Sequence, residues 1–225
     1  MAQIIPAIIP TSYEELASKA GQVKGIVRRV QVDVLDGKYT ETPASWPYND
    51  TDTDAWQRLI EQKNGLPHWD ALDYEIDLMT RAPEEKIDAW IVTGAASLII
   101  HIESTDHVTD IITHAKERGV EVGLALKPST DIERLTPWID QVAFVQCMGN
   151  DTIGAQGLAL DPRVVGKIED IRTRFPNVMI GVDIGVTEET APSLLRAGAT
   201  RLVSGSAIFM SSNAREAIAR LEDIQ

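Results

Sequence analysis

Short apolar segments alternate with amphipathic segments along the whole chain. Runs rich in Val and Ile predict buried strands, and the stretches between them have the period of helices. We count eight such units, with strands predicted at residues 3–9, 25–35, 72–79, 97–102, 120–126, 141–147, 177–183 and 201–203. Strands that alternate with helices are typical of an α/β protein with a parallel sheet.

Signals for helix ends fall between these strands. Residues 12–15 (SYEE) and 187–189 (TEE) resemble capping boxes, and Pro83 followed by two acids opens another helix. Glycines at positions 21, 94, 119 and 198 stand where helices should stop. A helix is therefore predicted after each strand.

Eight alternations in 225 residues fit a compact (β/α)₈ barrel, the TIM barrel, better than an open six-stranded sheet. The chain is long enough for one substantial core, and we expect residues 1–225 to form a single barrel domain. Active sites of such barrels lie at the C-terminal ends of the strands. Candidate site residues are therefore sought at those ends.

One connection, residues 38–52 (KYTETPASWPYNDTD), has neither helical nor strand periodicity and is too long for an ordinary βα loop. A lid over the barrel mouth and a solvated insertion both fit this segment. The lid is favoured, because Tyr39, Trp46 and Tyr48 are costly to leave in water.

Composition narrows the classes of partner. With 44% hydrophobic residues the chain is not disordered, and a net charge of −13 without a basic patch argues against a nucleic-acid partner. Apolar stretches fall far short of the ~20 residues of a membrane span, and Met1-Ala2-Gln3 lacks a cationic signal-peptide start. The single cysteine, Cys147, excludes an internal disulfide. We therefore expect a cytoplasmic protein with no membrane partner.

Acidic residues stand at the ends of three predicted strands. Asp33, Asp77 and Asp183 end the second, third and seventh strands, and period-two alternation turns Gln31 and Asp33 into the barrel. An inward carboxylate in an apolar strand is expensive unless it binds a metal, meets a partner or performs chemistry. Three acids at one barrel mouth therefore favour a functional site.

Glycine-bearing loops follow the last three strands. They are GNDTIGAQG at residues 149–157, Gly185-Val186, and Gly205-Ser206-Ala207, which begins a short helix. Loops of this kind, with free amides at a helix N-terminus, commonly bind phosphate in these barrels. The predicted phosphate-binding residues are Gly154, Ala155, Gln156, Gly185, Gly205 and Ser206.

Motifs in order along nearly the whole chain resemble the ribulose-phosphate 3-epimerase family. They are IIPAII (4–9), VDVLDG (32–37), DLM (77–79), HIE (101–103), ALKPST (125–130), GAQ (154–156), VDIGV (182–186) and GSAIF (205–209). The resemblance implies a ribulose-phosphate-binding barrel. It also implies an isomerase of carbohydrate metabolism that acts in pentose phosphate metabolism. Such an enzyme epimerises C3 of a ketose phosphate.

The resemblance also implies a mechanism and a ligand set. Asp33 and Asp183 are the matching proton-transfer residues, and a divalent metal stabilises the enediolate. The expected partner is a phosphosugar. The family often forms homo-oligomers, so a homo-oligomer of this chain is an open alternative to a monomer. The substrate pocket is expected to include Ala7, Leu35, Met79, His101 and Met148.

The chain departs from the family pattern at several of these positions. The family has His where this sequence has Gln31 and Asp77, Ser in place of Ala7, Met in place of Leu35, and Gly in place of Ile184. The remaining oxygen ligands are Gln31, Asp33, Asp77 and Asp183. Such a set suits Mg²⁺ or Mn²⁺ rather than zinc or iron, and whether a metal is retained stays open.

Two alternatives to the epimerase remain. The loss of both imidazoles is compatible with a non-catalytic phosphosugar-binding barrel. A related phosphosugar lyase or decarboxylase would use Lys127, but the Asp-x-Lys arrangement associated with that branch is missing from residues 75–79.

Overall fold

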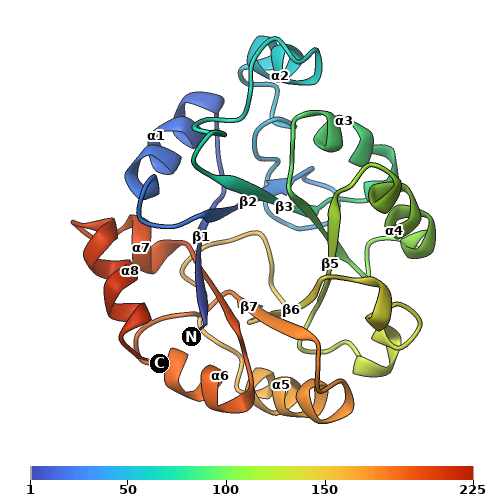
Figure 1. Ribbon diagram of the computed structural model, residues 1–225, viewed down its shortest axis with the longest axis vertical. Coiled ribbons are helices and arrows are strands. Elements are labelled where there is room, and N and C mark those ends of the chain that lie inside the picture. Colours follow the sequence, from blue (N-terminus) through green and yellow to red (C-terminus); the bar gives the residue numbers. More distant parts are fainter. Residues whose placement is uncertain (1, 225) are drawn as a thin grey trace.

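Eight parallel strands close into a barrel in the computed structural model, which describes residues 2–224 (Figure 1). Each strand pairs with the next along the chain, and the first also pairs with the last. The strands are β1 (Gln3–Ile8), β2 (Arg29–Leu35), β3 (Asp73–Met79), β4 (Ser97–His101), β5 (Glu121–Leu126), β6 (Phe144–Met148), β7 (Met179–Asp183) and β8 (Arg201–Ser204). The predicted (β/α)₈ barrel is thereby confirmed.

Helices surround the barrel (Figure 1). They are α1 (Tyr13–Val23), α2 (Thr53–Ile60), α3 (Ile87–Val92), α4 (Val108–Glu117), α5 (Arg163–Arg174), α6 (Ala191–Ala197), α7 (Ser206–Phe209) and α8 (Ala214–Glu222), with a 3₁₀ turn η1 (Pro83–Glu85) before α3. Helix α4 shows why they pack there, because Val108, Ile111, Ile112 and Ala115 recur at helical spacing and are buried. None of the helices within residues 2–224 is long and apolar enough to span a membrane.

The connection between β5 and β6 lacks the predicted α-helix. Within residues 127–143 the structure has two 3₁₀ turns, η2 (Ile132–Leu135) and η3 (Ile139–Gln141). Pro137 explains the difference, because it has no backbone N–H to continue a helix from the turn that ends at Leu135. The helix predicted after this strand was therefore wrong.

Two other helix boundaries differ from the sequence prediction. Ser12 caps α1 by accepting a hydrogen bond from the Glu15 amide at 3.1 Å, as predicted, but α1 continues through Gly21. Helix α6 begins later than residues 187–189, after the N-cap Thr190. Helix α1 ends instead just before Gly25, whose φ of +73° suits the left-handed conformation.

The middle of the long connection after β2, residues 45–47, is part of the core. Trp46 is 0% exposed, and its ring lies 5.7 Å from that of Tyr13, 5.9 Å from Trp56 and 6.5 Å from Trp90. Only the first part reaches the barrel mouth, where Tyr39 packs beside the site described below. The lid predicted from these aromatics was therefore wrong for Trp46, which is shielded from water by helices.

A charged layer fills the lower part of the barrel. Arg201 donates through Nη2 to both oxygens of Glu75, at 2.7 and 2.5 Å, and both side chains are buried. Arg29 adds a second ion pair to Glu75 at 2.9 Å, and the Arg201 guanidinium lies 3.8 Å from the ring centre of Phe144. Since alternation puts Glu75 and Asp77 on one face of β3, Asp77 occupies the next layer toward the mouth.

Candidate active site

A cavity of about 320 Å³ opens at the C-terminal ends of the strands. It is lined by eleven of the predicted site residues: Ala7, Asp33, Met79, Met148, Gly154, Ala155, Gln156, Asp183, Gly185, Gly205 and Ser206. The other four, Gln31, Asp77, Leu35 and His101, are fully buried behind this lining. The barrel therefore brings the predicted residues together, with some at the surface of the cavity and others supporting it.

Asp33 and Asp183 are joined by one amide group. Gln31 Nε2 donates to Asp33 Oδ1 at 2.7 Å and to Asp183 Oδ2 at 2.9 Å. Gln31 and Asp33 lie two residues apart on β2 and therefore share its inward face, whereas Asp183 ends β7. Asp33 and Asp183 are 4% and 6% exposed as whole residues, so both are nearly removed from water where they line the cavity.

Asp77 is held by two partners inside the barrel. His101 Nε2 lies 2.9 Å from Asp77 Oδ1, and Gln146 Nε2 donates to Oδ2 at 3.2 Å. His101 is therefore a buried partner of Asp77. Gln146 was not among the predicted residues, although alternation along β6 places it on the same inward face as Met148.

Burial and mutual repulsion shift the pKa values of the acidic side chains. Burial, then the charges of Asp183 and Asp77, raise the pKa of Asp33 well above its usual value. Burial and Asp77 raise the pKa of Asp183 to about 7. Burial lowers the pKa of His101, but the charge and hydrogen bond of Asp77 more than offset this, so its pKa is raised. Near neutral pH the pair can therefore supply one ionised and one protonated carboxyl group.

Three of the acids can hold a metal ion. Asp33, Asp77 and Asp183 each offer a carboxylate oxygen, and these oxygens all lie within 4.8 Å of one another. Gln31 Oε1 is buried and makes no hydrogen bond within the described part of the chain. The three carboxylates fit a hard cation with oxygen ligands. Gln31 faces Asp33 and Asp183 with Nε2, so its Oε1 would reach the same ion only after the side-chain amide turns over.

Glycine-bearing loops form the other side of the cavity. A Cβ on Gly205 would lie 2.5 Å from Gln156 Nε2, and one on Gly185 would lie 2.6 Å from the Leu160 nitrogen. Gln156 Nε2 also donates to the carbonyl of Ala7 at 3.3 Å, which ties the loop after β6 to β1. The three loops pack so closely that side chains at Gly185 and Gly205 would separate them.

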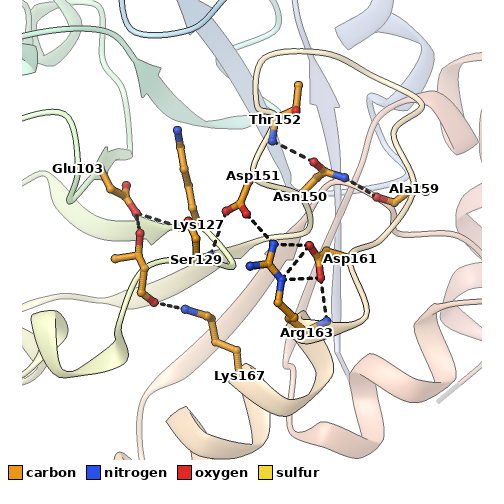
Figure 2. Close-up of polar contacts among 11 residues, drawn as sticks. Glu103, Lys127, Ser129, Asn150, Asp151, Thr152, Ala159, Asp161, Arg163 and Lys167 are labelled. Atoms are coloured by element: carbon orange, nitrogen blue, oxygen red, sulfur yellow. Dashed lines mark hydrogen bonds and ion pairs between the residues drawn. The ribbon is translucent and has the colours of Figure 1, made fainter.

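Figure 2 shows how polar contacts anchor the connection between β6 and α5. Asp151 accepts from the Ser129 amide at 3.0 Å and from Arg163 Nη2 at 2.6 Å, and Arg163 also pairs with Asp161. The Asn150 side chain bonds the backbone at two further points of the loop. These contacts fix both ends of the segment that carries Gly154–Gln156.

Several cavity-lining residues lay outside the predicted site. They are Ile9, Gly157, Leu158, Ile184, Val186, Thr187, Val203, Ser204, Ala207 and Met210. Most follow the ends of β1, β6, β7 and β8, so the rule that barrel sites lie at strand ends could have included them. Ile184 was visible in the sequence only as a departure from the family pattern.

A closed (β/α)₈ barrel with paired buried aspartates and glycine-bearing loops at its mouth belongs to the class of ribulose-phosphate-binding barrels. The model of the ribulose-phosphate 3-epimerase family matches residues 3–209. The chain therefore belongs to the ribulose-phosphate 3-epimerase family.

Relatives with this name match most of the chain. The ribulose-phosphate 3-epimerase of Schizosaccharomyces pombe is 27% identical over 223 residues, covering 99% of this chain and 93% of the relative. The Bacillus subtilis protein of that name is 28% identical, covering 98% of both chains, and the Treponema pallidum protein is 33% identical, covering 80% and 78%.

Solved structures show the same fold at low identity. A 3-hexulose-6-phosphate synthase aligns with a TM-score of 0.71 and 20% identity, covering 100% of this chain and 99% of its own. KGPDC from Streptococcus mutans also has a TM-score of 0.71, at 10% identity, covering 99% of this chain and 96% of its own. These likenesses support the barrel alone.

Proposed function

We propose that the protein inverts C3 of a ketose phosphate, as an isomerase like the ribulose-phosphate 3-epimerases of its family. The observation that carries the proposal is the pair Asp33 and Asp183, joined through Gln31 at the floor of the cavity. Family membership supports the same activity.

Epimerisation needs a base on one face of the substrate and an acid on the other. The C3 proton lies next to the carbonyl, so its removal leaves a planar enediolate that can be reprotonated from either face. Asp33 stands on β2 and Asp183 on β7, which are not neighbours in the barrel. Since burial raises the pKa of both carboxyl groups, one can be protonated while the other is ionised.

We propose that Asp33, Asp77 and Asp183 would hold a divalent metal, joined by Gln31 once its amide turns over to present Oε1 in place of Nε2. Mg²⁺ or Mn²⁺ is favoured because every ligand is then oxygen. When bound, such an ion stabilises negative charge on the enediolate oxygens. Binding of Mn²⁺, measured by electron paramagnetic resonance, should weaken at least tenfold in Asp77→Asn. An unchanged affinity would remove Asp77 from the ligand set.

We propose that Gly185, Gly205, Ser206 and the segment Gly154–Gln156 bind the phosphate group. Support comes from their shared position in the cavity and from the close packing at Gly185 and Gly205. Backbone amides at such loops bind phosphate without needing a cationic side chain. The proposed partner is therefore a small phosphosugar.

The test of the proposed activity follows the C3 hydrogen by NMR in D₂O, with D-ribulose 5-phosphate as substrate. Wild-type protein should exchange this hydrogen with solvent. Asp33→Asn and Asp183→Asn should each lower turnover by ~10²–10⁴-fold or more, the usual contribution of acid–base assistance, while phosphate affinity survives. Asp110→Asn, at an exposed position of α4 outside the cavity, is the control and should keep normal turnover.

Sugar-phosphate binding without exchange would instead support the non-catalytic binding barrel. The lyase alternative has less support, because Lys127 does not line the cavity and its ammonium lies 5.3 Å from the ring centre of Tyr39. We also propose that the protein is cytoplasmic and that residues 1–225 form one domain. Light scattering measures its oligomeric state.

A further inference from the structure

Gly181 leaves a small space inside the barrel, between two long polar side chains. It lies on β7 and is paired in register with Gln146 on β6 and with Arg201 on β8. A Cβ on Gly181 would lie 3.6 Å from Arg201 Nε and 3.7 Å from Gln146 Oε1. Apart from Gly181 and its two chain neighbours, no atom of the described residues comes closer than 3.6 Å to that point. The space is therefore wide enough for a group the size of a methyl.

This space is polar on two sides. Arg201 Nε carries a hydrogen and Gln146 Oε1 carries lone pairs, and the two residues are 1% and 0% exposed. Neither atom makes a hydrogen bond within residues 2–224. The far ends of both side chains are occupied, because Arg201 Nη2 donates to Glu75 and Gln146 Nε2 donates to Asp77. An unpaired donor and an unpaired acceptor are therefore left beside the same space.

Unpaired polar groups are costly in a barrel interior. A buried donor or acceptor without a hydrogen bond has lost its hydration and gained nothing in return. Nearly all such atoms in folded proteins therefore pair with the protein or with an ordered water. A buried water needs room for about one water-sized sphere and roughly two to four polar partners. The space beside Gly181 supplies the room, one donor and one acceptor.

We propose that Gly181 keeps open a binding site for one buried water molecule, which accepts a hydrogen bond from Arg201 Nε and donates one to Gln146 Oε1. This water joins the charged layer to the layer that contains Asp77, because Arg201 pairs with Glu75 and Gln146 donates to Asp77. It also holds Oε1 of the Gln146 amide, so that Nε2 stays directed at Asp77. The site does not depend on the proposed activity, and its test needs no substrate.

Substitutions at Gly181 distinguish a water site from a dry space. Gly181 is not among the residues with positive φ, so a side chain there does not strain the backbone. Gly181→Ala fills the space with a methyl group, which displaces the water and leaves Arg201 Nε and Gln146 Oε1 unpaired. Gly181→Ser adds a hydroxyl group one bond further on, which replaces the water as acceptor and donor. A dry space predicts the reverse order of stability, because a methyl group then gains packing and a buried hydroxyl group costs free energy.

Calorimetry measures this order as a shift of Tm. We expect Tm to fall by at least ~4 °C in Gly181→Ala and to stay within ~2 °C of wild type in Gly181→Ser. Gly166→Ala is the matched control, because Gly166 is exposed on α5 and an added Cβ would meet nothing within 4 Å. This control should keep or raise Tm, since alanine favours the helix. A higher Tm for Gly181→Ala than for Gly181→Ser would overturn the proposal.

A high-resolution crystal structure and NMR locate the water directly. In wild-type protein one water should lie within about 3 Å of both Arg201 Nε and Gln146 Oε1, and the Arg201 Nε proton should show a nuclear Overhauser effect to water. Both signals should be lost in Gly181→Ala. An unoccupied space in wild-type crystals, or an Overhauser effect of equal strength in Gly181→Ala, rejects the site. If the Gly181 variants fail to fold, the wild-type crystals decide alone.

Discussion

Glu75→Gln tests the charged layer in the lower barrel. The substitution keeps the shape of the side chain but removes its negative charge. Arg201 is 1% exposed and would then keep its charge without a carboxylate partner. We expect the free energy of unfolding to fall by about 3–5 kcal/mol, as when one partner of a buried ion pair is removed.

The size of this loss follows from the contacts. Glu75 accepts hydrogen bonds from two guanidinium groups, Arg201 at 2.7 and 2.5 Å and Arg29 at 2.9 Å. Hydrogen bonds to charged groups contribute about 1.5–3 kcal/mol each, and glutamine keeps only one acceptor oxygen. For a chain of 225 residues, each 1 kcal/mol shifts Tm by roughly 2–4 °C, so we expect Tm to fall by about 6–20 °C.

Urea unfolding followed by circular dichroism and calorimetry measures the loss. Asp73→Asn is the control, because Asp73 lies on the same strand and pairs at 2.9 Å with Arg28, whose side chain is 71% exposed. This variant should lose no more than about 1 kcal/mol. The reasoning is refuted if Glu75→Gln loses as little as the control. Glu75→Leu combined with Arg201→Met should recover most of the loss, since both fully buried charges are gone and Arg29, which is partly exposed, keeps Glu121 at 3.7 Å.

Two further predictions concern the loop after β6 and the acid stability of the fold. Arg163→Gln should raise KM several-fold with little change in kcat, because it frees the proposed phosphate loop at Asp151. The control Arg174→Gln breaks an exposed ion pair and should change neither constant in steady-state assays. Burial alone would raise the pKa of Glu15, but Lys19 and neighbouring hydrogen bonds lower it to about 2. Because the folded-state pKa is depressed, the stability this group contributes is complete above pH 4.5 and lost toward pH 2. The stability difference between wild type and Glu15→Gln in urea should therefore vanish over that range, and a constant difference would contradict it.

The fold could be predicted because the barrel repeats one simple pattern. Each strand buries both faces, so it appears in the sequence as a short apolar run, and the helices between the runs show their own period. The crossover after β5 escaped the pattern because Pro137 limits its helical structure to 3₁₀ turns. The connection holding Trp46 was misjudged because composition shows that an aromatic needs cover but does not show what provides it.

The sequence predicts which residues form the site but not which of their side chains contact one another. Alternation shows that Gln31, Asp33 and Asp77 point inward, and closure of the barrel brings Asp183 to them. Which inward residues touch depends on the register and tilt of strands far apart in sequence. The contact of Gln146 with Asp77 is therefore visible only in the folded barrel.

The pairing of β1 with β8 affects how the protein is made. Gln3 lies opposite Arg201 in this ladder, so the first strand of the barrel to be synthesised has to wait for the last. Until then both ends of the growing sheet expose unpaired backbone groups, which are templates for pairing with other chains. Nascent chains that stop before residue 201 should therefore depend on chaperones to avoid aggregation. The arrival of β8 removes both edges in one step.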